Sequence, residues 1–172
     1  TVSNDGRATI QLDGPGTSKA VSIIVTAPNG ESKTYRITIN RAASSNNNLS
    51  ALTVAPGPLS PAFASDRLTY TVDVATTVTS VTVAATKSDP DAVMSGSVTA
   101  GTGAATGQAT LPLDGPGTSK NVSITVTAPN GNAKTYTITV NRAAPSSDAA
   151  LSALTVSAGT LNPGFSASTL TY

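Results

Sequence analysis

The stretch LDGPGTSKNVSITVTAPNGNAKTYTITVNRA, from Leu113 to Ala143, decides the fold of this chain. It contains two runs in which apolar and polar residues alternate, joined by the dipeptide Asn130-Gly131. A period of two is typical of a strand with one buried face, and Asn-Gly between two such runs is the strongest short signal for a β-hairpin. The stretch therefore predicts two antiparallel strands around a tight turn.

The same stretch occurs once before, from Leu12 to Ala42, at an offset of 101 residues. Only two of its first 19 positions differ between the copies: Ala20 stands against Asn121, and Ile24 against Thr125. A second motif, LSALTV, begins at residue 49 and again at residue 151, an offset of 102. The chain is therefore built from tandem repeats of about 100 residues.

These offsets divide the chain into five parts. They are the C-terminal part of one repeat (1–42), a linker (43–48), a complete repeat (49–142), a second linker (143–150) and the N-terminal part of a further repeat (151–172). The linkers are polar and lack apolar periodicity. Because both chain ends fall inside a repeat, we expect either a longer natural protein or neighbouring chains that complete the partial repeats.

The complete repeat shows about seven short strand patterns and no helical periodicity of useful length. The patterns lie near 52–54, 68–74, 81–85, 93–98, 109–113, 122–126 and 136–140. Turn signals every 8 to 12 residues favour an all-β protein of two packed antiparallel sheets, an immunoglobulin-like β-sandwich.

Three local patterns add detail to this fold. Ala8, Ile10 and Leu12 alternate with polar residues and predict a half-buried strand in the first partial repeat. Pro112 lacks a backbone donor, which predicts an edge strand or a strand end there. The segment from Gly101 to Gly107 is rich in Gly, Ala and Thr, and we expect a flexible loop.

Composition excludes several classes of function. The net charge is +1, only 11% of residues are charged, and no basic run is present, so a nucleic-acid partner is not supported. Cysteine and histidine are absent, which excludes disulfides, Cys/His zinc sites and histidine-based catalysis. With no acidic residue in an inward strand phase, we predict that the chain is not an enzyme and needs no cofactor. No apolar run of 18 residues suggests membrane insertion of this segment.

Several motifs taken together resemble a known family. They are LSALTVSAGTLNPGFSASTLTY, VTSVTVAATKSDPDA and ITVTAPNGNAKTYTITVNRA. The set is similar to the cadherin-like β-sandwich domain of bacterial surface proteins. The resemblance implies an extracellular, tandemly repeated β-sandwich in a large secreted or wall-attached protein. It implies no catalysis and brings no functional residues with it.

Asp89 and Asp91 flank Pro90, and Asp13 and Asp114 begin the two DGPG turns. Calcium prefers six to eight oxygen ligands, usually with several carboxylates, whereas the acidic residues of this chain are mostly spread apart. Aspartate at such positions commonly caps a turn. We favour turn chemistry and keep weak calcium binding at Asp89 or Asp91 as the alternative.

The six aromatic residues pair between copies: Tyr35 with Tyr136, Tyr70 with Tyr172, and Phe63 with Phe165. Each tyrosine shares the phase of inward Val or Ile residues, which predicts core positions with the hydroxyl at the sheet rim. A carbohydrate-binding platform would need exposed aromatic rings, and this pattern leaves none for that purpose.

Other candidate sites have weaker support. An isopeptide bond needs a lysine, an Asn or Asp and a buried acid, but we place Lys134, Asn141 and Asp73 in outward phases. The outward threonines suit a solvated strand face better than ice binding. The matches to the N-glycosylation pattern at Asn48 and Asn121 are interpreted as accidental. Ile24, in an outward phase, could mark a contact with another domain or chain.

The preferred hypothesis is a non-catalytic structural module of a long repetitive extracellular surface protein: a stalk, fibre or filament element. Its expected partners are neighbouring repeats of the same chain and other copies, which would associate by sandwich packing or strand complementation. The alternative is an adhesin or polysaccharide-binding module with a cell-surface or glycan partner.

Overall fold

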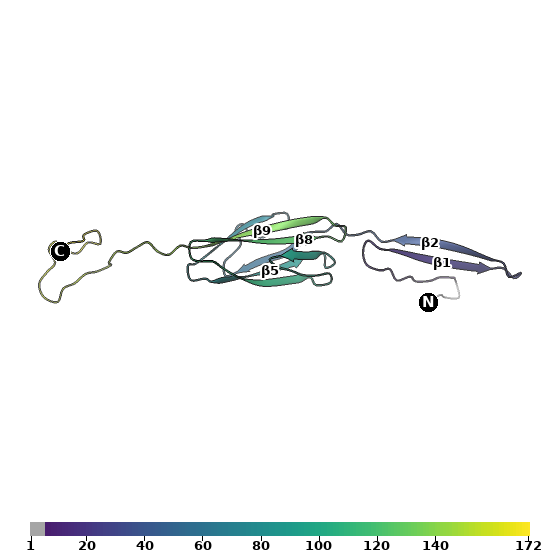
Figure 1. Cartoon of the computed structure of the whole chain (residues 1–172), viewed down its shortest axis with the longest axis horizontal. Helices are drawn as coiled ribbons and strands as arrows, with labels where there is room; N and C mark the ends of the chain where they lie inside the picture. The colour runs from purple at the N-terminus through teal and green to yellow at the C-terminus, as the bar shows by residue number, and fades with distance from the viewer. Residues whose placement is uncertain (1–5) are drawn as a thin grey trace.

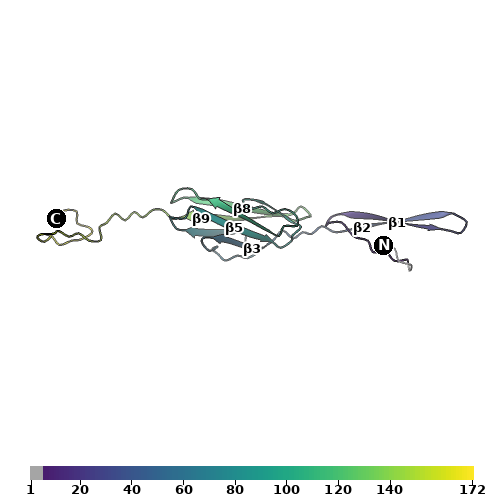
Figure 2. The same cartoon turned by 90° about the horizontal axis from the view of Figure 1, so that it is seen from below.

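The computed structural model describes residues 6–172. Within that range the chain forms three bodies: an N-terminal fragment (residues 6–42), a complete sandwich (49–142) and a C-terminal fragment (151–172) (Figure 1). The chain enters the complete sandwich at one end and leaves it at the other, as both views show (Figure 2). The first five residues of the predicted partial repeat lie outside the described residues.

The described residues contain these strands: β1 (Ser18–Thr26), β2 (Ser32–Asn40), β3 (Leu49–Ala55), β4 (Thr69–Val74), β5 (Ser80–Lys87), β6 (Val93–Gly96), β7 (Thr106–Pro112), β8 (Ser119–Thr127) and β9 (Ala133–Arg142). Seven of them belong to the complete sandwich, as the sequence predicted. The predicted hairpin is β8 with β9, and its earlier copy is β1 with β2.

The turns of both hairpins have the same geometry because they have the same residues. Gly30 and Gly131 adopt φ values of 90° and 91°, a region that glycine enters without a steric penalty. The side chains of Asn29 and Asn130 accept hydrogen bonds from backbone amides two residues later, at 3.1 and 3.0 Å. The Asn-Gly signal was therefore interpreted correctly in both copies.

The complete sandwich has one sheet with the order β3-β5-β7 and a second with the order β4-β9-β8-β6. This three-plus-four division is typical of immunoglobulin-like sandwiches. The alternating strands direct one side of each sheet into a shared core. That core contains Leu49, Leu52, Val54, Tyr70, Val72, Val74, Val81, Val83, Ala85, Ala92, Met94, Val98, Ala100, Val122, Ile124, Val126, Tyr136, Ile138 and Val140.

One feature of the topology corrects the prediction that both sheets are antiparallel. β4 pairs with β9 in parallel, from Thr69 opposite Thr137 to Val74 opposite Arg142. Between β3 and β4 the chain runs back alongside β4, with Ser60 opposite Thr71 in an antiparallel bridge, and β4 then runs in the same direction as β9. Alternation of residue types identifies a strand but carries no information on its direction.

The predicted strand from Ala8 to Leu12 is wrong for the N-terminal fragment, since residues 8–12 form no strand there. In the complete sandwich the counterpart strand, β7, pairs only with β5. The N-terminal fragment contains no counterpart of β5, and its residues 8–12 therefore lack the neighbour that makes β7 a strand; Ala8 alone forms an isolated bridge.

The loop prediction for Gly101 to Gly107 is also partly wrong, because β7 begins at Thr106. Gly107 is buried in this strand, and a Cβ atom there would lie 2.4 Å from the carbonyl oxygen of Thr99. Glycine at this position thus permits a close backbone approach rather than flexibility. Pro112, in contrast, ends an edge strand as predicted.

Candidate functional site: the junction between repeats

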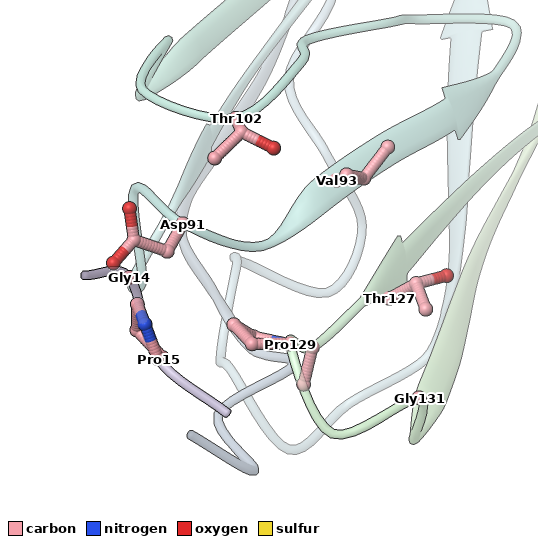
Figure 3. Close-up of a pocket in the computed structure, with 9 residues that line it drawn as sticks. Gly14, Pro15, Asp91, Val93, Thr102, Thr127, Pro129 and Gly131 are labelled. Atoms are coloured by element: carbon pink, nitrogen blue, oxygen red, sulfur yellow. The ribbon is translucent and has the colours of Figure 1, made fainter. Parts of the chain in front are cut away.

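The candidate site lies where the N-terminal fragment meets the complete sandwich. Gly14 and Pro15, from the first DGPG turn, form one wall of a cavity of about 510 Å³ (Figure 3). Asp91, Thr102 and Pro129, from three loops at the entry end of the sandwich, are among the residues on the other side. The site therefore combines residues of the N-terminal fragment with residues of the complete sandwich.

The DGPG turn is held in shape by residues that recur in the next repeat. The Arg41 guanidinium donates to the carbonyl of Asp13 at 2.9 Å, and the Thr17 hydroxyl donates to the carbonyl of Gly14 at 2.7 Å. The counterparts 101 residues later make the same bonds: Arg142 to Asp114 at 2.8 Å, and Thr118 to Gly115 at 2.7 Å. The N-terminal fragment and the complete sandwich thus carry the same turn.

The loops on the opposite side are organised by Lys87, the last residue of β5. Its side chain is only 3% exposed. The ammonium group donates to the carbonyls of Pro90 at 3.2 Å, of Gly101 at 2.8 Å, and of Ala92. One lysine thereby connects the loop after β5 to the loop before β7, and both loops contribute residues to the cavity.

The electrostatic environment of Lys87 contains opposing effects. Burial lowers the pKa of this lysine, because desolvation disfavours its charged form, while the nearby carboxylates of Asp89 and Asp91 raise it. A buried lysine with several carbonyl acceptors acts as a structural cation. Sequence reasoning missed this residue, although Lys87 continues the inward phase of Val81, Val83 and Ala85.

The turn interpretation of Asp89 is confirmed. Its carboxylate accepts a hydrogen bond from the Asp91 backbone amide at 2.9 Å and caps the turn that follows β5. Asp13 lies 3.8 Å from the Lys19 ammonium. Within residues 6–172, no three acidic side chains gather in a group that could hold a metal ion.

The three residues considered for an isopeptide bond, Lys134, Asn141 and Asp73, do not form one cluster. We placed Lys134 in an outward phase, and this was wrong: Lys134 shares the phase of Tyr136, is half-buried, and donates to the side chain of Asn48. Asn141 faces outward and donates to the carboxylate of Asp73 at 2.8 Å. The structure therefore brings Asn141 and Asp73 together and places Lys134 elsewhere.

The tyrosines of the complete sandwich occupy core positions as predicted. Tyr136 is fully buried, and its hydroxyl accepts from the Leu49 amide at 3.1 Å and donates to the Ser65 carbonyl at 2.8 Å. Tyr70 donates to the carbonyl of Ala64 at 2.7 Å. Tyr35, the counterpart of Tyr136 in the first copy, is in contrast 56% exposed, because the N-terminal fragment lacks the sheet that covers Tyr136.

The remaining candidates fit ordinary surface roles. Thr125 and Thr135 join their hydroxyls across β8 and β9 at 2.9 Å on the exposed face. Of the two glycosylation matches, Asn48 accepts from Lys134, and Asn121 accepts from Thr139. Ile24 is exposed on β1, and in the structure it also borders an apolar groove of the N-terminal fragment.

Fold and site together define an all-β sandwich module with a cavity between its entry loops and the first DGPG turn. The model of the cadherin-like beta sandwich domain matches residues 49–143, and the chain belongs to this family. Such domains are generally non-catalytic, typically extracellular modules of structural or adhesive type. No curated protein matches the chain. No helix within residues 6–172 is long and apolar enough to cross a membrane.

Proposed function

We propose that this chain is a structural module of a long, repetitive extracellular surface protein that forms a stalk, fibre or filament. One observation carries the proposal: an almost unchanged hairpin recurs 101 residues later, and the second copy supplies the last two strands of a complete sandwich. Near-identity over Leu12–Gly30 includes the turn residues at both ends of the hairpin, and these are the residues that face a neighbouring repeat.

The path of the chain supports an extended array. Because the linkers leave the sandwich at opposite ends (Figure 1), successive repeats follow one another along a line instead of folding back. Each repeat offers a DGPG turn at its exit and a set of loops at its entrance. A protein that must span distance with a repeated unit requires such matched ends.

Strand complementation between chains has less support than a continuous array. The C-terminal fragment of one chain could supply the counterpart of β3 to the N-terminal fragment of another. Neither fragment contains a counterpart of β5, which lies between β3 and β7. The joined fragments would therefore lack the middle strand of one sheet and much of its core.

The adhesin alternative would need a ligand-binding surface on the sandwich. Tyr70 and Tyr136 are buried and Phe63 is half-buried, and these rings cannot form a sugar-stacking platform. Glycan-array binding by the whole chain, with an affinity that survives in the Tyr35→Ala variant, would favour this alternative.

The test is to locate the protein on intact cells that produce it. Antibodies raised against this chain should label fibres or stalks outside the cell, with several gold particles along each projection in electron micrographs. Labelling confined to the cytoplasm would contradict the extracellular role. Labelling only as single points at the cell surface, with no elongated structure, would contradict the stalk or filament.

A further inference from the structure

The first linker, residues 43–48, lies against the complete sandwich. The Asn130 amide donates to the carbonyl of Ser44 at 3.1 Å, and the Ser88 amide donates to the carbonyl of Asn48 at 2.9 Å. All linker residues except Ser45 are at least partly buried. The second linker, residues 143–150, is exposed throughout. The two linkers therefore differ in whether a folded sandwich follows them.

The shape of the linker is encoded within the linker itself. The Ser44 hydroxyl accepts from the Asn46 amide at 3.2 Å, and the Asn46 side chain accepts from the Asn48 amide at 3.1 Å. The second linker makes the same pair of bonds, from Asp148 to Ser146 at 3.1 Å and from Ala150 to Asp148 at 2.9 Å. Because the exposed linker has this shape too, the shape does not depend on docking.

The sandwich contributes side chains that contact the docked linker at its end. Lys134 donates to the Asn48 side chain, and the Tyr136 hydroxyl accepts from the Leu49 amide that follows. Asn130, Lys134 and Tyr136 all lie on β9 or on the turn that leads into it. A single hairpin end therefore holds the carbonyl, the side chain and the following amide of the linker.

The N-terminal fragment carries the same three residues 101 positions earlier, as Asn29, Lys33 and Tyr35. There, Lys33 and Tyr35 line an open cavity of about 180 Å³ together with Glu31 and two apolar residues. In the complete sandwich the corresponding lysine and tyrosine contact Asn48 and Leu49. The linker receptor is thus a feature of each hairpin, filled in one copy and open in the other.

We propose that the segment 43–48 is a recognition element that docks on the following repeat through Asn130, Lys134 and Tyr136, leaving only a short hinge near Ala42 between repeats. The proposal rests on the proposed function, because its partner is the next repeat of an array. The hairpin end thus has a role beyond joining two strands, since it binds the linker that precedes the sandwich.

The test uses the whole chain and its two linkers as an internal comparison. Backbone ¹⁵N relaxation should show residues 44–48 as ordered as the sandwich, and residues 144–150 markedly more mobile. The Asn130 amide should exchange its hydrogen at least about tenfold more slowly than the Asn29 amide. Equal mobility of the two linkers would overturn the proposal.

Two variants separate docking from local shape. Asn48→Ala gives the first linker the residue that the second has at this point, Ala150, and removes the acceptor of Lys134. We expect this variant and Lys134→Met to increase the mobility of residues 44–48 while the sandwich stays folded. Lys33→Met, the same change in the open receptor, should leave the first linker unchanged.

These outcomes are distinguishable from a failure of the proposed function. A mobile first linker in a protein that still labels extracellular fibres would remove the docking proposal and leave the stalk intact. An ordered linker in a protein found only inside cells would do the opposite. A Lys134→Met chain with an unchanged linker would show that the lysine contact plays no part in docking.

Discussion

At the scale of single residues, Lys87 shows how a buried charge can serve a loop cluster. Its ammonium is the hydrogen-bond donor that joins two loops through backbone carbonyls, and backbone acceptors cannot be exchanged by mutation. The carbonyls of Pro90 and Gly101 each have a second donor, the amides of Gly103 and Ala104. The loss of Lys87 would therefore affect the Ala92 carbonyl most.

We predict that Lys87→Met lowers the free energy of unfolding by about 1–3 kcal/mol, because a buried carbonyl loses its donor while the side-chain volume is nearly kept. Urea unfolding of the whole chain would measure this loss. Hydrogen exchange should become faster in the loops of residues 88–92 and 101–105. Lys33→Met, at an exposed lysine, is the control, and a variant as stable as the original protein would contradict the role given to Lys87.

Tyr136 should make the stability of the folded chain depend on pH in the alkaline range. Burial raises the pKa of this phenol above its usual value near 10. A group with a raised folded-state pKa contributes stability that is complete below the unfolded pKa and is lost as pH rises through the folded pKa. We therefore predict that this contribution declines from about pH 10 upward.

The Tyr136→Phe variant tests this effect. At neutral pH it should lose about 1–3 kcal/mol of unfolding free energy, because the Leu49 amide and the Ser65 carbonyl lose their partner. Above pH 10 the difference between variant and original should shrink. Tyr35→Phe, at the exposed copy, should change neither value, and a constant difference across this pH range would contradict the assignment.

The residue scale also shows where sequence reasoning failed. Inward and outward phases were predicted correctly for Tyr70 and Tyr136, because apolar neighbours on both sides defined the period. Lys134 was assigned to the wrong face because its charge suggested a solvent-facing side chain. Lys134 lies two residues before Tyr136 on β9, however, and therefore points to the same side of the strand. Lys87 was overlooked for the same reason. Long amphipathic side chains can extend from an inward position to a polar rim.

At the scale of elements, the sequence contained most of the fold. Asn-Gly turns and alternation predicted both hairpins, and the seven strands of the complete sandwich agree with the structure. The parallel pairing of β4 with β9 was missed because alternation identifies a strand without showing its direction. The strand at residues 8–12 failed because pairing needs a partner, and the pattern within a segment cannot show that the partner is missing.

The start of β7 offers a direct test, because residues 106 and 107 were first interpreted as part of a loop. A Cβ at Gly107 would lie 2.4 Å from the Thr99 carbonyl oxygen and 2.8 Å from Met94 Cε. We predict that Gly107→Ala costs about 1–3 kcal/mol of stability, because backbone and core must both shift. In Gly101→Ala the new methyl group would meet no atom within 4 Å, and this control should stay within about 0.5 kcal/mol of the original. Similar denaturation midpoints for the two variants would show that β7 is as adaptable as a loop.

At the scale of the whole molecule, the linkers and the DGPG turns lie at the two ends of the sandwich, so that the chain runs through it from one end to the other. The exit turn of one repeat and the entry loops of the next face each other across the cavity, while the linker is bonded to the entry loops. Tension applied along such a chain passes through every sandwich from its first strand to its last. The arrangement of those strands then decides how the module resists extension.

We predict that the complete sandwich resists force most strongly when pulled through its own ends. Tension that enters at Leu49 acts along β3 and then β4, and tension that leaves at Arg142 acts along β9. Because β4 and β9 are parallel, opposite pulls on the start of one and the end of the other load all six paired residues of β4 together. Hydrogen bonds loaded together must break together, whereas an antiparallel hairpin pulled at its open end loses them one at a time.

The chain lacks cysteine, so that attachment points can be placed freely for single-molecule force measurements. Attachment at Asn47→Cys and Ala143→Cys applies the lengthwise load. Attachment at Thr118→Cys and Ala143→Cys shares one anchor but opens the β8–β9 hairpin from its end, where Ser119 is opposite Asn141. The first pair should unfold at a clearly higher force than the second. Equal forces in the two geometries would mean that the parallel pair of β4 and β9 is not what resists extension. The resistance of a stalk to force would then have to come from the packing of the core alone.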